Sequence, residues 1–328
     1  MIKLKDLGEK GFIKNIIEEN KRIWIWGPLK PGDDASAVPY LGGYIILKID
    51  GFASHDSKYP WNTWRDFGWK AVTACVSDIL SKGGKPFAYL ISLGMPGDMS
   101  VEDGLEIMRG VAEAIDYYGG YLAGGDTNSS KDDVWIDVAC VGHSSNDPIG
   151  RNAQPGDHII ITGDYGLTGL AYLLYLKYLD KKIDIKDVPH EVVSTTSRPR
   201  APIETYDLLN KYRKCIRGSV DISDSLAESL YLLSEFSGYS IKLHDIPINS
   251  FVREFSSKEN IDPVELALYG GEEFQLILSI DPSCTNDFLK DLKRRNINAD
   301  VYGVVTEERR VAVYLKEREI YRKGFQHF

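Results

Sequence analysis

Runs of apolar residues with strand-like and helix-like spacing alternate along the first half of the chain. Strand-like runs are expected at 43–49, 87–93, 121–123 and 134–142, and helices at 64–82 and 100–118. The first strand stops at Asp50, so this carboxylate is expected at the edge of an ordered element. Ser100 is followed three residues later by Asp103, which is typical of a helix N-terminus. The pattern predicts a sheet with helices packed against it.

A run of turn-forming residues at 144–148, Ser-Ser-Asn-Asp-Pro, separates this half from a second one. After it, a strand is expected at 158–162, a helix at 167–178, a helix from Pro202, a strand at 218–222 and a helix from Ser223. The alternation is typical of α/β or α+β layers around mixed sheets. We therefore expect two domains, 1–147 and 148–328.

Composition supports a globular chain and excludes several kinds of partner. Of 328 residues, 43% are hydrophobic and 27% are charged, and 48 acidic residues against 39 basic ones give a formal charge of −9. Nucleic acid is not expected as a partner, because phosphate backbones need a concentrated basic face. No apolar run is long enough for a membrane span, and no signal peptide is recognisable at the N-terminus. The four cysteines form no C-x-x-C pair, so reduced thiols and a cytoplasmic location are expected.

Aspartates at the edges of the predicted elements are the main candidates for chemistry. Seven of them stand beside glycine, serine or an apolar run: Asp33, Asp34, Asp50, Asp78, Asp126, Asp221 and Asp224. A buried carboxylate is costly without a counter-charge, and arginine is scarce near these positions in the sequence. Mg²⁺ takes carboxylate oxygens together with substrate phosphates. The pattern therefore predicts a site for Mg²⁺ and a phosphate-bearing substrate.

Each motif alone also has a structural interpretation. Asp33-Asp34 can belong to a turn, Asp224 to the first turn of a helix, and Gly124-Gly125-Asp126 to a loop. The segment Gly163-Asp164-Tyr165-Gly166 resembles a phosphate-binding turn before a helix, but it has no P-loop lysine, and tight strand-to-helix packing is favoured. His55, with Trp61 and Trp64, fits either a substrate lid or an interface.

The order of the motifs resembles that of thiamine-monophosphate kinase, within the aminoimidazole ribonucleotide synthetase-like superfamily. In chain order the motifs are Gly-Asp-Asp-Ala, Ser-Asp-Ile-Leu, Gly-Gly-Asp-Thr, Arg-x-x-Ala-x-Pro-Gly-Asp, Asp-Ile-Ser-Asp, Gly-Gly-Glu-Glu-Phe and the terminal Gly-Phe-Gln-His-Phe. The resemblance extends nearly from end to end. It implies a two-domain fold of mixed sheets covered by helices, with an ATP- and metal-binding N-terminal domain that pairs in a homodimer and a C-terminal domain that contributes to the active site.

The resemblance also assigns roles to individual residues. The seven aspartates would hold several Mg²⁺ ions, with Asp126 and Asp224 also catalytic. Gly125, Arg151 and Ser223 would contact ATP. His55, Glu272 and Phe325 would meet the acceptor, thiamine monophosphate. The implied reaction is direct in-line transfer of a phosphoryl group from ATP, which needs positioning and metal ions more than covalent catalysis.

Three departures from the family pattern concern the acceptor. Ile49 replaces a threonine, Ser225 replaces a glycine, and the segment from Asp50 to His55 is shorter than usual and lacks a glutamate. One alternative is a related ATP-dependent enzyme that activates an amide, a carboxamide or another phosphate. A second is a nucleotide-binding regulator without catalysis, which the presence of all seven aspartates disfavours.

Overall fold

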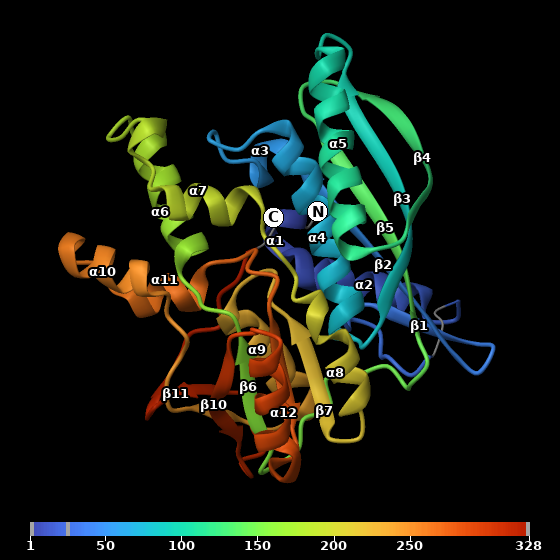
Figure 1. Cartoon of the computed structure of the whole chain (residues 1–328), viewed down its shortest axis with the longest axis vertical. Helices are drawn as coiled ribbons and strands as arrows, with labels where there is room; N and C mark the ends of the chain where they lie inside the picture. The colour runs from blue at the N-terminus through green and yellow to red at the C-terminus, as the bar shows by residue number, and fades with distance from the viewer. Residues whose placement is uncertain (1–2, 24–26, 326–328) are drawn as a thin grey trace.

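The computed structural model describes residues 3–23 and 27–325, and it contains two sheets connected by a buried helix (Figure 1). The elements up to residue 144 are α1 (Leu4–Leu7), α2 (Glu9–Asn20), β1 (Ser36–Tyr40), β2 (Gly43–Ala53), α3 (Ser54–Ser57), α4 (Trp64–Ser81), β3 (Lys85–Pro96), α5 (Val101–Tyr118), β4 (Tyr121–Ser130) and β5 (Trp135–Ser144). Their strands form a mixed sheet in the order β1-β2-β5-β3-β4. Only β3 and β4 are parallel, which agrees with the α5 crossover between them.

The second sheet has seven strands in the order β12-β11-β8-β10-β6-β9-β7. The strands and short 3₁₀ turns of this half are β6 (His158–Thr162), η1 (Ile185–Asp187), η2 (Ile203–Thr205), β7 (Ile216–Asp221), β8 (Ile241–Leu243), β9 (Leu276–Ile280), β10 (Ala299–Val305), β11 (Val313–Leu315) and β12 (Arg318–Glu319). Its helices are α6 (Leu167–Leu179), α7 (His190–Ser197), α8 (Tyr206–Lys211), α9 (Leu226–Ser237), α10 (Ser250–Glu259), α11 (Pro263–Tyr269) and α12 (Pro282–Arg294). The predicted fold class, two mixed sheets covered by helices, is confirmed.

Helix α4 is almost completely buried. Thr63 caps its N-terminus: the Thr63 hydroxyl accepts from the Asp66 N–H, and the Asp66 carboxylate accepts from the Thr63 N–H. Every residue from Phe67 to Ser81 is buried. Helix α5 crosses it closely, because a side chain at Gly68 or Gly110 would collide with main-chain atoms of the other helix. The two helices thus form a rigid layer on one face of the five-stranded sheet.

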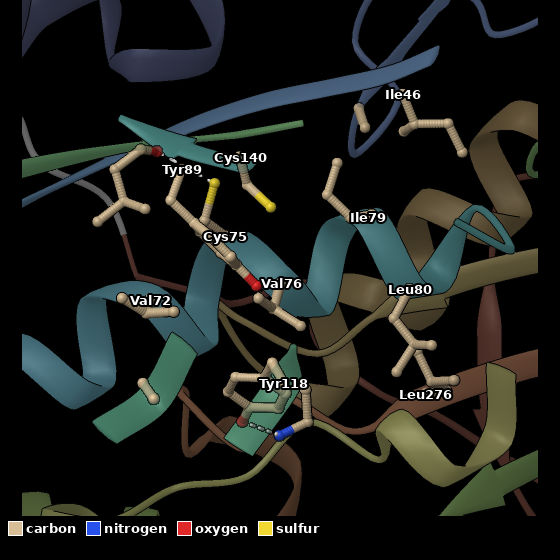
Figure 2. Packing of buried hydrophobic residues seen from close by; sticks show 14 of the residues in the cluster. Ile46, Val72, Cys75, Val76, Ile79, Leu80, Tyr89, Tyr118, Cys140 and Leu276 are labelled. Carbon is tan, nitrogen blue, oxygen red and sulfur yellow. Dashed lines mark hydrogen bonds between the residues drawn. The ribbon is translucent and has the colours of Figure 1, made fainter. Parts of the chain in front are cut away.

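One cluster of buried apolar side chains includes residues of α4 and of both sheets. Leu80 of α4 belongs to it together with Leu276 of β9, and both lie in the packing shown in Figure 2. The opposite face of the seven-stranded sheet is filled by a second cluster, to which α9 contributes. Because α4 packs against both sheets, residues at its C-terminal end lie where the two halves meet.

Several elements differ in extent from the prediction. β2 continues past Asp50, because its ladder with β5 runs on to the pair Ala53 and Trp135. β4 continues through Gly124-Gly125-Asp126, so the loop interpretation of this motif is wrong; a side chain at Gly125 would collide with the Ile91 carbonyl, and glycine allows the close strand pairing. The helix expected from Ser223 begins at Leu226, with Ser225 as its N-cap.

Cys215 and Cys284 form a disulfide that joins the segment after α8 to α12. The expectation of reduced thiols is wrong for this pair. The spacing of 69 residues carries no local signal, because tertiary packing alone brings the two positions together. Cys75 and Cys140 are free and buried. No helix in the described ranges has the length and hydrophobicity needed to cross a lipid bilayer.

Candidate functional site

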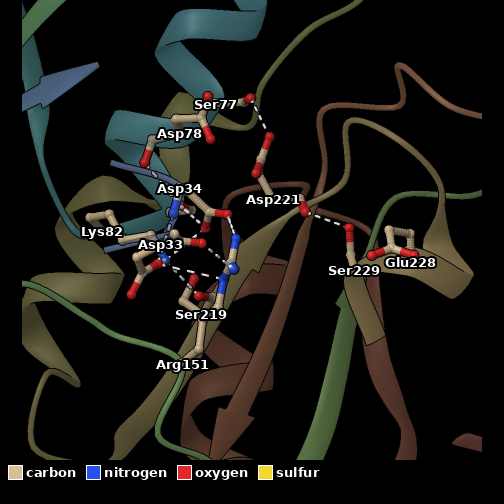
Figure 3. Close-up of polar contacts among 12 residues, drawn as sticks. Asp33, Asp34, Ser77, Asp78, Lys82, Arg151, Ser219, Asp221, Glu228 and Ser229 are labelled. Carbon is tan, nitrogen blue, oxygen red and sulfur yellow. Dashed lines mark hydrogen bonds and ion pairs between the residues drawn. The ribbon is translucent and has the colours of Figure 1, made fainter. Parts of the chain in front are cut away.

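Three buried carboxylates converge between the two sheets. Asp34 comes from the segment before β1, Asp78 from α4 and Asp221 from the end of β7, and one oxygen of each lies within 4.8 Å of the others (Figure 3). Two oxygens on opposite sides of one Mg²⁺ are about 4.2 Å apart, so the spacing of the three ligands is close to what this ion requires. The predicted convergence therefore holds for Asp34, Asp78 and Asp221.

Serine hydroxyls orient two of these carboxylates. Ser77 donates to Asp221 at 2.7 Å, and Ser81 donates to Asp34 at 3.1 Å. Both serines are buried on α4, one turn apart, and the single hydroxyl hydrogen of each is shared between the carboxylate and a carbonyl within the helix. The helix that supplies Asp78 thus also fixes its two neighbours.

Two basic side chains compensate part of this charge: Lys82, which the sequence analysis missed, and Arg151, which it assigned to ATP. Lys82 Nζ lies 2.7 Å from Asp33 Oδ1 and 2.7 Å from Asp34 Oδ2, and it donates to the Ser219 carbonyl at 2.8 Å. Arg151 pairs with Asp34 and donates to the Gly32 carbonyl at 3.0 Å. Arginine is scarce near Asp33 and Asp34 in the sequence, but the fold brings Lys82 and Arg151 to them. The available signal was Lys82 itself, a lone lysine at the end of an apolar helix, which needs a buried partner.

The carboxylates differ in their electrostatic state. Burial would raise the pKa of Asp34, but Arg151 and Lys82 hold it well below its usual value. Burial, and then the neighbouring Asp221, raise the pKa of Asp78 well above its usual range. Burial and Asp34 raise the pKa of Asp221 to about 7, despite the hydrogen bond from Ser77. Asp78 and Asp221 are therefore the members that need further positive charge.

Lys48 supplies the third internal cation. It lies on β2, with its Nζ 3.1 Å from Asp50 Oδ1 and 2.8 Å from Asp78 Oδ2. Counting Asp33, Asp34, Asp50, Asp78 and Asp221 against Lys48, Lys82 and Arg151, five formal negative charges face three positive ones. Two negative charges are left, and a divalent cation matches them.

Asp126 lies on the other face of the five-stranded sheet. In the ladders it pairs with Ser92, and Ser92 pairs with Asp137, whereas Asp50 pairs with Val138 on the alternate face that packs against α4. Asp126, Ser92 and Asp137 line a cavity of about 270 Å³ on the outer face together with Ile49. The chain by itself does not join Asp126 or Gly125 to the cluster of Asp34, Asp78 and Asp221. Ile49, which replaces the family threonine, likewise lies near Asp126 and not near that cluster.

Ser223 and Asp224 follow β7 and approach the acceptor residues. Burial raises the pKa of Asp224 to about 6, although nearby Lys10 opposes the shift. The Ser223 carbonyl accepts from the Glu272 N–H at 2.6 Å. A side chain at Gly324 would meet the Asp224 side chain, so the C-terminal segment passes directly over this position. Ser225 donates to the Lys323 carbonyl at 2.7 Å, so the residue that departs from the family pattern holds that segment.

The predicted acceptor residues occupy two separate environments. Both oxygens of Glu272 accept from Lys70 Nζ, at 2.9 and 2.8 Å, and Lys70 also donates to the Ser57 carbonyl. The Phe52 and Tyr59 rings lie 5.7 and 6.0 Å from this ammonium group. Lys70 was missed by the sequence analysis, although a lone lysine inside the apolar part of α4 was the signal.

His55 and Phe325 are more exposed. His55 Nδ1 lies 2.6 Å from Asp133, and this hydrogen bond raises the pKa of the imidazole. Phe325 is about half exposed at 49%, while Gln326, His327 and Phe328 of the terminal motif lie outside the described residues. Trp61 donates to Thr196 of α7 at 3.0 Å, a contact within the chain that neither the lid nor the interface interpretation predicted.

The N-terminus of α6 is filled by a protein carboxylate. Glu273 accepts from the Thr168 hydroxyl at 2.7 Å and from the Gly166 N–H at 3.3 Å. Glu273 is buried, and burial raises its pKa to about 7 despite these hydrogen bonds. The Gly163-Asp164-Tyr165-Gly166 turn therefore serves strand-to-helix packing, as the sequence favoured, and its helix end is already occupied.

Comparison with known proteins agrees with these motifs. The N-terminal domain of AIR synthase related protein matches residues 32–144, and its C-terminal domain matches residues 154–316. Thiamine-monophosphate kinase of Pyrococcus abyssi is 33% identical over 76% of both chains, and that of Aquifex aeolicus is 29% identical over 100% of both. The solved structure of AaThiL complexed with AMPPCP and TMP has a TM-score of 0.86 at 27% identity, covering 100% of this chain and 99% of that chain. With its buried aspartates and its relatives in agreement, the chain belongs to the thiamine-monophosphate kinase family.

Proposed function

We propose that this protein transfers the terminal phosphoryl group of ATP to thiamine monophosphate in a reaction that requires Mg²⁺. The group of Asp33, Asp34, Asp50, Asp78 and Asp221, which keeps two formal negative charges after its three internal cations, carries the proposal. Relatives named thiamine-monophosphate kinase, and a related structure complexed with AMPPCP and TMP, support the choice of both substrates.

Some of these residues would bind Mg²⁺, and others would position its ligands and the substrates. Asp34, Asp50, Asp78 and Asp221 would hold Mg²⁺, with Asp224 at the acceptor end; bound Mg²⁺ would neutralise phosphate charge during transfer. Asp33 remains a predicted ligand, and its partners in the structure are Lys82 and Arg151. Arg151 is buried against Asp34 and the Phe236 ring, which supports a role in positioning Asp34 beside the ATP phosphates. Gly125, Arg151 and Ser223 remain proposed ATP contacts.

The acceptor would bind where the Glu272 loop, Asp224 and the C-terminal segment meet. Glu272 connects these parts, because its side chain is held by Lys70 and its N–H by Ser223. Phe325 follows the segment that crosses Asp224, which supports its proposed stacking on the acceptor. His55, on α3 directly after β2, is retained as a proposed acceptor contact.

We also propose a homodimer formed through the outer face of the five-stranded sheet. Leu47, Ile49 and Leu90 are 39, 65 and 46% exposed on this face. Asp126 lies on the same face, so a dimer would enclose it and could complete the ATP site across the interface. In this arrangement residues 1–147 form the dimerising, metal-binding domain and residues 148–328 the second domain. Light scattering tests it: twice 36.8 kDa is expected, and Ile49→Arg should yield the monomer.

The function is tested by incubating the purified protein with ATP, Mg²⁺ and a panel of phosphate, amide and carboxamide acceptors. Thiamine diphosphate and ADP should form together, and chelation should abolish both. Asp221→Asn should lower kcat by roughly 100-fold or more, whereas the control Asp287→Asn, at an exposed position on α12, should leave it unchanged. ADP formed only with another acceptor would favour the related enzyme, and ATP binding without turnover would favour the regulator.

A further inference from the structure

Lys48 differs from the other internal cations in what holds it. Lys82 and Arg151 each donate to a main-chain carbonyl as well as to carboxylates, and both side chains are at most 4% exposed. Within residues 3–23 and 27–325, the Lys48 ammonium is held by Asp50 and Asp78 alone, and its side chain is 22% exposed. Lys48 is thus the cation that can leave its partners without breaking the backbone framework.

Both partners of Lys48 are proposed metal ligands. Lys48 and Asp50 stand two residues apart on the same face of β2, and Asp78 faces them from α4. Asp78 also belongs to the group of three carboxylates within 4.8 Å. An ammonium N–H and a Mg²⁺ ion both need carboxylate lone pairs, so Lys48 occupies oxygens that the metal requires.

We propose that Lys48 is a positioning residue that competes with Mg²⁺ for Asp50 and Asp78 and thereby sets the affinity of the site for the metal. The inference rests on the proposed metal site. Without metal, Lys48 keeps the two carboxylates together against their mutual repulsion. When a divalent ion takes these oxygens, the flexible four-carbon side chain withdraws but stays close enough to offset the charge of arriving phosphates.

The direction in which metal affinity changes when Lys48 is removed distinguishes a lysine that competes with the metal from one that only supports the structure of the site. Removing the ammonium group takes the formal charge of the site from two negative to three and frees two sets of lone pairs. A competing cation therefore weakens metal binding, and its loss should tighten it by roughly tenfold or more. A lysine that only supported the fold of the site would do the opposite, since its removal would disorder the ligands and weaken metal binding.

Calorimetric titration of the metal-free, full-length protein with Mn²⁺, in the absence of ATP, tests the proposal. Lys48→Met should bind Mn²⁺ roughly tenfold more tightly than the wild type, and the control Lys85→Met, at an exposed position on β3, should bind it equally. Equal or weaker binding by Lys48→Met overturns the proposal while leaving the metal site intact. If the wild type binds no Mn²⁺, the proposed function fails together with it.

If Lys48→Met folds poorly, two further variants test the proposal: Asp50→Asn alone, and Asp50→Asn combined with Lys48→Met, which has the same formal charge at the site as the wild type. Asp50→Asn alone removes a ligand and one negative charge, so it should weaken Mn²⁺ binding. Adding Lys48→Met to it restores two negative charges, and the affinity should return to within a few-fold of the wild type. A double variant that binds as weakly as Asp50→Asn overturns the competition, and circular dichroism confirms that each variant is folded.

Discussion

Replacing Glu273 by glutamine should make the stability of the protein less dependent on pH. The Glu273 carboxyl is buried at the N-terminus of α6 and its pKa is raised to about 7, from an ordinary value of 4.5, chiefly by burial. Between these pH values the folded state retains a proton that the unfolded chain has lost. The stabilisation is therefore complete below about pH 4.5 and is lost as the pH rises through 7.

The size of the pKa shift of Glu273 determines how much the free energy of unfolding should change with pH. A difference of about 2.5 pH units corresponds to about 3 kcal/mol, of which roughly 2.5 kcal/mol falls between pH 5 and pH 8. Glutamine keeps the shape, and its side-chain oxygen can still accept from Thr168, but it carries no titrating proton. The free energy of unfolding of Glu273→Gln, relative to the wild type, should rise by this amount over that range.

Urea denaturation at several pH values between 5 and 8 measures the difference directly. Because the two proteins share all other titrating groups, their contributions largely cancel in the difference. Glu265→Gln, at an exposed position on α11, is the matched control and should give a difference independent of pH. A flat difference for Glu273→Gln as well would refute the reasoning, since it would mean that burial does not hold the proton on Glu273.

Three further predictions concern the framework and the acceptor. Reducing the Cys215–Cys284 disulfide, which closes a loop of 69 residues, should lower the free energy of unfolding by about 4 kcal/mol, measured by urea denaturation with and without reductant. Lys82→Met removes one of the two basic partners of the buried carboxylates Asp33 and Asp34 and should cost about 3–5 kcal/mol in the same assay, whereas Lys85→Met should cost little. Phe325→Ala should raise the KM for thiamine monophosphate several-fold, as expected from the roughly 0.5–1.5 kcal/mol of an aromatic stack, without changing the KM for ATP or the Tm. Early melting with both KM values raised would assign Phe325 to anchoring the C-terminus instead.

The sequence predicted those parts of the fold that local chemistry determines. The helix after Ser100 begins where the capping pattern placed it and ends before Gly119. The strand ends were predicted less well, because β2 and β4 are extended by their neighbours: Asp50 stays in β2 because β5 continues to pair with it. Strand length of this kind depends on the partner strand and is not encoded in the strand itself.

The sequence predicted the acids of the site and Arg151, but not its lysines. Asp34, Asp78 and Asp221 stand in recognisable motifs, whereas Lys48 and Lys82 stand in ordinary strand and helix sequence and become partners only when the two sheets meet. The position of Asp126 could not be predicted, because which face of a sheet a residue occupies depends on strand register. Motif order identifies which residues belong to a site, and tertiary structure decides which of them meet within one chain.

Helix α4 would also fix the distance between the proposed acceptor loop and the proposed metal site. Lys70, which holds the proposed acceptor loop through Glu272, and Asp78, at the proposed metal site, are eight residues apart, about 12 Å at 1.5 Å per residue. Because α4 is buried from Phe67 to Ser81, this separation cannot relax when a ligand binds. Chemical variation among acceptors can be accommodated by side chains near Lys70, but the reach from the acceptor loop to the transferred phosphate is constant. Evolution of this scaffold toward other acceptors is therefore expected to change the groups recognised before it changes the distance spanned.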